Sequence, residues 1–458
     1  MSDESLADLP ADTAGESPAE AFARVERALA DRVPGKDEVL AMQPDISRIS
    51  LLVDLLGEPQ RSYPSIHLTG TNGKTSTTRM VDALLRGFGL RPGRYTSPHL
   101  ASVRERIAVD GDPLDEEAFA RAYDDVAPYH ALVDERSPLR VTYFEALTAM
   151  AYAAFADAPV DVAVVEVGMG GLWDATNVLH AGTCVITPVS LDHPELGSTV
   201  EQVATEKAGI IHEGARVVSG VQELAAAEVL VRRCAEVGAE LAVEGIHFGV
   251  AERRVAVGGQ VLTIRGLGGV YEEVFLPLHG SYQASNAACA LTAVEAFLGG
   301  GEQPLDVDAV RAGFARVESP GRLEVVRRSP TVLLDGAHNP GGTAALVGAL
   351  DESFGFDRLV GVVAILSDKD AHAMLSMLEP VLSDVVVTTN RSPRALSADD
   401  LAAVAVDVFG PDRVVVEPML PDAIDAAVAL ADEAGEGAGV LVTGSLYTVG
   451  EARTLLLG

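Results

Sequence analysis

Apolar and polar residues along this chain follow two periods, which divide it into strand-like and helix-like segments. Short apolar runs predict buried strands at residues 66–68, 160–167, 184–189 and 217–221. Apolar positions three or four apart predict helices at residues 75–85, 144–155 and 225–237. Strands that alternate with helices are typical of a mostly parallel sheet covered by helices. The first half of the chain is therefore predicted to be an α/β domain.

The pattern changes twice further along. Residues 246–278 form short alternating stretches broken by glycine pairs, which predicts antiparallel hairpins, and a helix is expected at 285–298. Residues 318–322 have the composition of a linker, after which strand and helix alternate again, with apolar runs at 332–334, 359–365, 385–388, 414–416 and 440–442. This second alternation predicts a smaller, doubly wound, Rossmann-like domain. We expect an acidic disordered tail at 1–18, a large first domain at 19–318 and a smaller C-terminal domain at 322–458.

Composition narrows the class of protein. The formal net charge of −33 disfavours nucleic acid and anionic membranes as partners, because both would be repelled. The longest apolar candidate segment, residues 146–156, is well short of the roughly 20 residues that span a bilayer. The acidic start is unlike a secretory signal. Three cysteines without close spacing (Cys184, Cys234 and Cys289) argue against disulfides or a zinc site and favour the cytoplasm.

The segment from Thr69 to Ser76, Thr-Gly-Thr-Asn-Gly-Lys-Thr-Ser, lies between the first predicted strand and the first predicted helix. Glycines let backbone amides point at phosphate oxygens, the lysine adds a positive charge, and a hydroxyl can reach a magnesium ion. The strict P-loop pattern requires glycine where Leu68 stands, but the chain has only four lysines and one of them is Lys74. We predict that ATP binds here, through Thr71, Asn72, Gly73, Lys74, Thr75 and Ser76.

Polar residues also follow the neighbouring apolar runs. Glu166 begins the glycine-rich stretch at 166–171, and His193 ends the stretch at 190–193. Since ligands lie at the carboxyl ends of parallel strands, these two side chains could hold a divalent cation near the phosphates. A dinucleotide fingerprint is rejected, because its third glycine would fall on Trp173.

These motifs, in order and over nearly the whole chain, resemble the folylpolyglutamate synthase and dihydrofolate synthase family of the Mur ligase superfamily. The motifs are Gly-Thr-Asn-Gly-Lys-Thr-Ser at 70–76, Thr-Ser-Pro-His-Leu at 96–100 with Arg-Glu-Arg-Ile at 104–107, 166–171 with Asp-Ala-Thr-Asn at 174–177, Leu-Asp-His at 191–193, Glu-Lys-Ala-Gly-Ile at 206–210, Asp-Gly-Ala-His-Asn-Pro at 335–340, Asp-Lys-Asp at 368–370 and Gly-Ser-Leu-Tyr at 444–447. The resemblance implies an ATP-dependent ligase that joins L-glutamate to dihydropteroate and to folate γ-glutamyl tails through an acyl phosphate. It also implies small-molecule partners only, two magnesium ions and a monomer.

The resemblance assigns roles to single residues. It implies catalytic roles for Lys74, Lys207 and His338, with Lys207 carboxylated by CO2, and metal ligation by Ser97, Glu166, His193 and Lys207. ATP would also contact Asn286, Arg322 and Asp335, and glutamate would contact Arg106, His338 and Ser445. The pterin would contact Asp45, Ile46, Ser47, Thr142, Trp173, Asp174 and Ala175, near Leu172, where the family often has arginine.

Two other functions compete with this one. A Mur-type peptide ligase of cell-wall synthesis shares the ATPase core, but would need an N-terminal nucleotide-sugar domain, and only 65 residues precede the first predicted strand. A nucleotide switch that hydrolyses ATP or GTP without ligation would not need the set Glu166, His193, Lys207 and Asp335. The preferred folate, the tail length, and whether the enzyme has one activity or two are left open by the sequence.

Overall fold

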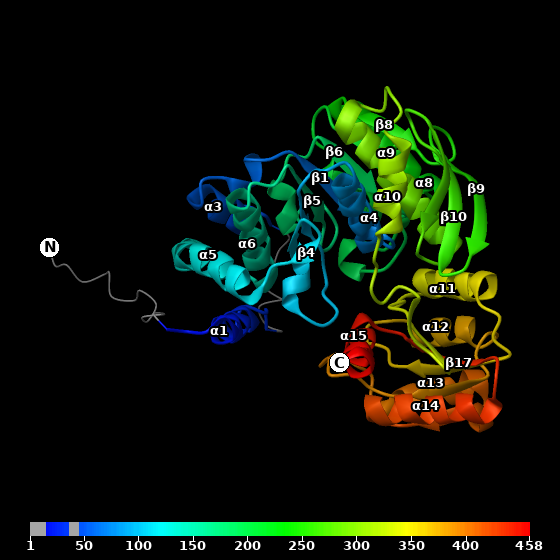
Figure 1. The fold of residues 1–458 in the computed structure, drawn as a ribbon. Coiled ribbons are helices and arrows are strands. Elements are labelled where there is room, and N and C mark those ends of the chain that lie inside the picture. The colour runs from blue at the N-terminus through cyan, green and yellow to red at the C-terminus, as the bar shows by residue number, and fades with distance from the viewer. Residues whose placement is uncertain (1–14, 36–44) are drawn as a thin grey trace, which may run out of the picture.

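The computed structural model describes residues 15–35 and 45–458. Two bodies follow one another along the chain, the N-terminal one from blue to green and the C-terminal one from yellow to red in Figure 1. Most of the tail expected at 1–18 lies outside the described residues. Its last residue begins helix α1 (Pro18–Ala30), which Ser17 caps through a reciprocal side-chain bond with Glu20.

The N-terminal body is built on an eight-stranded sheet. Six of its strands run parallel, and β3 and β4 join antiparallel at one edge. In spatial order the strands are β4 (Asp112–Pro113), β3 (Ile107–Val109), β2 (Pro92–Tyr95), β5 (Val162–Glu166), β1 (Ser65–Thr69), β6 (Thr183–Ile186), β7 (Arg216–Ser219) and β8 (Glu240–Val243). Because β1, β5 and β6 are neighbours, their carboxyl ends bring the motifs that follow them to one place.

Helices cover both faces of this sheet, since successive strand residues point to opposite sides. One face packs on α4 (Lys74–Gly87), α9 (Ser281–Gly299) and α10 (Val307–Ala315). The other packs on α1, α3 (Ser47–Leu55), α5 (Glu116–Arg136) and α6 (Tyr143–Asp157) at one end and on α7 (Val200–Lys207) and α8 (Leu224–Val237) at the other. Every residue of β1 and β5 is buried, as expected for central strands of a sheet covered on both faces.

A small antiparallel sheet extends the first of these cores. It consists of β9 (Gly249–Ala256), β10 (Gly259–Arg265) and β11 (Val270–Leu276), in the order β11-β10-β9. Its inward residues, among them Leu262, Ile264 and Val274, pack with α9 and α10. The predicted hairpins at 246–278 are therefore present.

The C-terminal body has its own six-stranded sheet, in which only β12 is antiparallel. The spatial order is β12 (Glu324–Arg328), β13 (Thr331–Leu334), β17 (Ala438–Thr443), β14 (Arg358–Val363), β15 (Asp384–Val387) and β16 (Val414–Val416). One face packs on α11 (Pro340–Ser353), α12 (Ala371–Leu378) and α13 (Ala398–Phe409), and the other on α14 (Leu420–Ala434) and α15 (Leu446–Leu457). We place the boundary between the two domains in the linker at 319–321.

The fold class is confirmed, while several predicted element limits are wrong. Strand β6 ends at Ile186 rather than at residue 189, because Pro188 has no amide to donate to a neighbouring strand. Strand β5 begins at Val162 and ends at Glu166, which pairs with Leu68, so it is shorter at both ends than the predicted run 160–167. Helix α9 begins four residues before the predicted start, at Ser281. Among the described residues, none of the helices has the length and apolarity to cross a membrane.

Candidate active site

The carboxyl edge of the large sheet faces the C-terminal domain across a cavity of about 350 Å³. Both domains and the linker line it, which brings together most of the predicted site residues. From the N-terminal domain these are Thr71, Asn72, Gly73, Lys74, Thr75, Ser76, Ser97, Glu166, His193 and Asn286, and from the linker and C-terminal domain Arg322, Asp335, His338 and Ser445. We refer to this cavity as the cleft.

The loop between β1 and α4 forms one wall of the cleft. Gly70 has a φ of 147°, and a Cβ there would overlap the hydroxyl oxygen of Thr187. A Cβ on Gly73, which has a φ of 91°, would lie 2.6 Å from the Asn286 side-chain oxygen. Both positions thus require glycine. The loop delivers the chain to the first turn of α4, where unpaired backbone amides are available to phosphate oxygens.

Two lysines share one acceptor in this loop. Lys74 Nζ donates to the Gly70 carbonyl oxygen at 3.0 Å and to that of Thr71 at 3.2 Å. Lys207 Nζ donates to the same Gly70 oxygen at 2.8 Å from the end of α7. Burial and the nearby charge of Lys74 lower the pKa of Lys207 to about 7. An uncharged amine is therefore accessible to Lys207 near neutral pH, directly beneath the phosphate loop.

Glu166 is the buried carboxylate of the cleft. It accepts a hydrogen bond from Thr75 Oγ1 at 2.8 Å and one from the Ser97 amide at 3.3 Å. Burial raises its pKa, and the charge of Lys74 and the bond from Thr75 partly offset that rise. A carboxylate bonded to the Thr75 hydroxyl, with Ser97 in the same lining, offers hard oxygen donors, the kind that Mg²⁺ prefers.

The described residues hold no group of three or more His, Cys, Asp or Glu side chains that could cage a metal ion. Magnesium usually keeps several waters and binds one or two carboxylates together with substrate phosphates. Glu166, Ser97 and Thr75 fit such a site. His193 also lines the cleft, with its Nε2 3.5 Å from Asp192 Oδ2, and burial lowers its pKa.

The C-terminal wall presents polar groups that its own backbone holds in place. Asp335 accepts hydrogen bonds from the amides of Leu323 and Ala337, both at 2.9 Å. Burial raises the pKa of Asp335, and the charge of Arg322 opposes that rise. His338 Nδ1 lies 2.8 Å from the Gly336 carbonyl oxygen, so it is this nitrogen that carries the proton.

Ser445 ends the strand-to-helix connection after β17. Its side chain caps α15 by accepting from the Tyr447 amide at 3.2 Å.

Burial lowers the pKa of His338 to about 4, so its imidazole is neutral around pH 7. The wall thus offers one neutral imidazole, one hydroxyl and one buried carboxylate to the cleft.

Two direct contacts join the walls across the cleft. Lys369 Nζ donates to Asp192 Oδ1 at 2.8 Å, and both side chains are only 8% exposed. Although burial raises the pKa of Asp192, its hydrogen bond to Lys369 and the charges of His193 and Lys369 hold that pKa below its ordinary value. Asn339 Nδ2 donates to Asn72 Oδ1 at 3.3 Å. These contacts fix the C-terminal domain above the phosphate loop.

Arg106 lies apart from His338 and Ser445, which the resemblance grouped with it. It is buried outside the residues that line the cleft, where its Nε donates to His99 Nδ1 at 2.9 Å. Its guanidinium lies over the Tyr143 ring, 5.4 Å from the centroid. The three residues therefore do not line one cavity here.

The residues assigned to the pterin also lie outside the lining of the cleft. Asp45 accepts from the amide and hydroxyl of Ser47, and this lowers its pKa; Ile46 precedes α3. Thr142 caps α6. Phe144, in the first turn of α6, contacts the glycine-rich loop. It packs so closely against Gly168 that a Cβ on Gly168 would overlap the Phe144 ring.

Asp174 supports the glycine-rich loop rather than facing open space. Its carboxylate accepts from the Met169 and Thr176 amides, both at 2.9 Å, and from the Thr176 hydroxyl. Trp173 donates its backbone amide to Glu206 at 3.2 Å, and Ala175 is buried. Leu172, by contrast, is 53% exposed next to this loop.

Sequence reasoning gave no role to Asp192 or Lys369, although both stood in quoted motifs. The signal that could have found Lys369 is the scarcity of lysine: of the four lysines, Lys36 lies outside the described residues, and Lys74, Lys207 and Lys369 all lie at or beside the cleft. No comparable signal marked Asp192, one of many acidic residues.

Comparisons with known proteins agree with this geometry. Residues 68–294 match the Mur ligase middle domain and residues 321–446 the Mur ligase glutamate ligase domain. The chain is 52% identical over 439 residues to the dihydrofolate synthase/folylpolyglutamate synthase of Mycobacterium tuberculosis, covering 90% of each chain. It is 35% identical to the folylpolyglutamate synthase of Lacticaseibacillus casei, over 92% of this chain and 96% of that one.

Solved structures give the same result. The M. tuberculosis folylpolyglutamate synthase complexed with ADP superposes with a TM-score of 0.92 and 50% identity, over 96% of this chain and 99% of that one. An FPGS–AMPPCP–folate complex superposes with a TM-score of 0.80 and 32% identity, over 95% and 100% of the two chains.

Proposed function

The chain belongs to the folylpolyglutamate synthase/dihydrofolate synthase family of the Mur ligase superfamily, and we propose that it has both activities of that family. It is an ATP-dependent ligase that joins glutamate to folates and takes small molecules as substrates. The finer proposal is that it ligates L-glutamate to dihydropteroate as well as to the γ-glutamyl tails of (tetrahydro)folates, in each case through an acyl phosphate. The observation that carries the ligase chemistry is the placement of Lys74, Lys207 and Glu166 opposite Asp335, His338 and Ser445. The second activity is supported by the likeness to the dihydrofolate synthase/folylpolyglutamate synthase of M. tuberculosis.

In this proposal the phosphate loop binds and polarises the γ-phosphoryl group. The Lys74 ammonium leaves the Gly70 and Thr71 carbonyl oxygens and moves the short distance to phosphate oxygens. There it stabilises negative charge as the phosphoryl group passes to the substrate carboxylate. Asn286, Arg322 and Asp335 hold the rest of the nucleotide, and their place in both domains explains why closure would complete the site.

Magnesium, two ions in the family pattern, would be held by Ser97, Glu166 and His193, with Thr75 beside them. When bound, it neutralises phosphate charge and orients the triphosphate. Glu166 serves this role because Thr75 and the Ser97 amide fix its carboxylate in a buried position.

Lys207 is proposed to carry a carbamate. The Lys207 ammonium first loses one proton, and the uncharged amine then attacks the carbon of CO2. A C–N bond forms as one C–O π bond opens, and a second proton is released, so that a cation becomes an anion. The lowered pKa of Lys207 supports this, because the reaction needs the unprotonated amine. The charge reversal would replace a group that repels magnesium with two oxygens suited to it.

On the opposite wall, His338 and Ser445 are proposed to bind glutamate and present its amine to the acyl phosphate. Arg106 belongs to this set only if the Arg106–His99 bond breaks when substrate enters. Asp45, Ile46, Ser47, Thr142, Trp173 and Ala175 remain the proposed pterin contacts, and Asp174 acts through the Gly168–Met169 backbone. We also propose a cytoplasmic monomer, which the three free, buried cysteines fit.

Side-by-side turnover tests the two activities. Purified enzyme is given dihydropteroate or tetrahydrofolate with MgATP, and glutamate-dependent ADP release is measured. We expect release with both substrates and its loss in Lys74→Ala. Turnover with one substrate alone would reduce the proposal to a single activity. ADP release that needs no glutamate would favour a nucleotide switch, and activity only with nucleotide-linked peptide precursors would favour a cell-wall ligase.

A further inference from the structure

A second, larger cavity lies between the domains on the other side of the linker. It has a volume of about 1140 Å³ and is lined by the β9–β10 turn, residues 277–279, the linker, the β12–β13 turn and residues 353–356. We call it the linker groove. Nothing in the proposed ligase chemistry uses it, although it is in the size range of small-molecule sites or larger.

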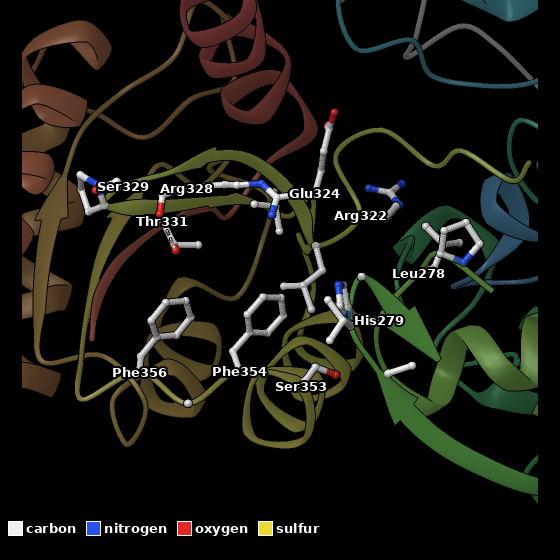
Figure 2. Close-up of a pocket in the computed structure, with 18 of the residues that line it drawn as sticks. Leu278, His279, Arg322, Glu324, Arg328, Ser329, Thr331, Ser353, Phe354 and Phe356 are labelled. Atoms are coloured by element: carbon white, nitrogen blue, oxygen red, sulfur yellow. Dashed lines mark hydrogen bonds between the residues drawn. The ribbon is translucent and has the colours of Figure 1, made fainter. Parts of the chain in front are cut away.

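One wall of the linker groove is aromatic. Phe354 and Phe356 lie with their rings parallel within 5° and their centroids 5.7 Å apart, and the His279 ring lies 4.8 Å from that of Phe354. Figure 2 shows the two phenyl rings side by side along the floor of the groove, with His279 at the end nearer the N-terminal domain. Such a row of rings favours a flat aromatic ligand that stacks on it.

A cation faces this wall. Arg328 runs along the β12–β13 hairpin above the rings in Figure 2, and its guanidinium makes no hydrogen bond or ion pair within the described part of the chain. Arg453, which also borders the groove, is already paired with Glu324 at 3.1 Å. An unpaired guanidinium opposite phenyl rings suits a ligand with one carboxylate or sulfonate on an aromatic ring.

The groove also contains an unsatisfied polar atom. Nδ1 of His279 is buried and has no hydrogen-bond partner among residues 15–35 and 45–458. Burial lowers the pKa of His279, so the ring is neutral and this nitrogen can pair with a polar ring substituent. A ligand would thus satisfy an atom that the protein leaves without a partner.

Three exposed carboxylates, Glu318, Asp432 and Glu436, border the same groove. They would repel a polyanion such as ATP more strongly than a single negative charge. The charge pattern therefore favours an aromatic monoanion over a nucleotide.

The linker connects the groove to the cleft. Arg322 lines both cavities, and the hydroxyl of Ser319 lies 3.0 Å from that of Ser76 in the first turn of α4. A ligand that shifts the linker would therefore shift a residue of the nucleotide site. We propose that the linker groove binds a small aromatic monoanion and that its occupation changes nucleotide affinity in the cleft.

The test uses 8-anilinonaphthalene-1-sulfonate, an aromatic monoanion whose fluorescence reports binding. The full-length protein and two variants, Arg328→Gln and Arg327→Gln, are titrated with it. Arg327 is the matched control, because it is the neighbouring exposed arginine on β12, lies outside the groove lining and bonds the Ser329 carbonyl oxygen. We expect Arg328→Gln to weaken binding by about tenfold and Arg327→Gln to leave it unchanged. Phe354→Leu should also weaken it.

Coupling is measured by titrating ADP with and without the probe. We expect ADP affinity to change in the wild type but not in Arg328→Gln, and ADP to change probe affinity by the same factor. Equal probe affinity in all three proteins would show that the probe does not bind in the linker groove. Full displacement of the probe by ADP, in Arg328→Gln and wild type alike, would show that the probe binds in the cleft instead. If bound probe leaves the affinity for ADP unchanged, the proposed coupling between the linker groove and the cleft is wrong.

Discussion

The carboxyl edges of the two parallel sheets face each other across the cleft, and they are built differently. The edge of the N-terminal sheet combines a backbone that only glycine permits with charges that lack a settled partner. Lys74 and Lys207 both donate to the single Gly70 carbonyl oxygen, and burial lowers the pKa of Lys207. On the C-terminal edge, Asp335 and His338 are each held by neighbouring backbone groups.

This difference indicates a division of labour. Unsettled charge is suited to the step in which charge moves, because a bound triphosphate can satisfy Lys74, while the amine of Lys207 is left to form the proposed carbamate. Groups held by their own backbone are suited to positioning, since they need no rearrangement when substrate arrives. The N-terminal edge is thus expected to carry the chemistry and the C-terminal edge the orientation of nucleotide and amine.

The largest expected effect comes from Gly70, at the centre of the strained edge. Gly70→Ala would force a Cβ onto the Thr187 hydroxyl at a φ that alanine rarely adopts. We expect glutamate-dependent ADP release to fall to background and stability to drop by about 1–3 kcal/mol or more. Gly182→Ala is the control, because it lies in the same domain with no atom within 4 Å of the added Cβ. Equal activity in the two variants would contradict the strained-edge interpretation.

Much of this edge could be predicted from the sequence, because the rule that ligands follow parallel strands needs only the strands. Lys74, Glu166 and His193 were placed near one another in this way, and all three line the cleft. The strand ends were less accurate: the effect of Pro188 on β6 was missed, and β5 is shorter at both ends than the predicted run 160–167.

Contacts that depend on how two elements meet could not be predicted. The Lys369–Asp192 pair joins residues 177 positions apart in different domains, and no periodicity encodes the angle between domains. The hydrogen bond from the Met169 amide to Asp174 depends on the course of the loop between them. Arg106 lies outside the cleft because its guanidinium contacts His99 and the Tyr143 ring.

The second prediction concerns the Lys369–Asp192 ion pair, which connects the two edges across the cleft. Lys369→Met and Asp192→Asn should each lower kcat/KM, because each leaves the other partner buried without its counter-charge. The double variant should lose less than the sum, with a coupling energy of about 1–3 kcal/mol. Steady-state kinetics of the four proteins give this number. Strict additivity would mean that the pair does not act as a unit in closure.

The third prediction uses the pKa of Lys207. In metal-free, CO2-free protein the pKa is about 7, below the ordinary lysine value, so the folded state binds fewer protons than the unfolded state above pH 7. Wild-type stability should therefore rise from pH 7 toward 10 relative to Lys207→Met, by at most about 1.4 kcal/mol per pH unit. Denaturant titrations at several pH values measure it. Parallel pH profiles would mean that Lys207 is charged when folded.

The smallest expected effect has the opposite sign and lies in the C-terminal domain. Gly348 is an exposed residue within α11, has no atom within 4 Å of an added Cβ, and lacks the positive φ of Gly70. Alanine there removes backbone freedom from the unfolded chain without strain in the folded one, so Gly348→Ala should stabilise by about 0.5–1 kcal/mol. Activity should be unchanged, because α11 meets the cleft at its other end, near Gly342 and Ala345. The unfolding midpoint measures the gain, and a lower midpoint, or a loss of turnover at full stability, would show that glycine in α11 serves the cleft as Gly70 does. Replacing glycine by alanine would then be harmful at both edges. The proposed contrast, in which the N-terminal edge is strained and the C-terminal edge is not, would be wrong.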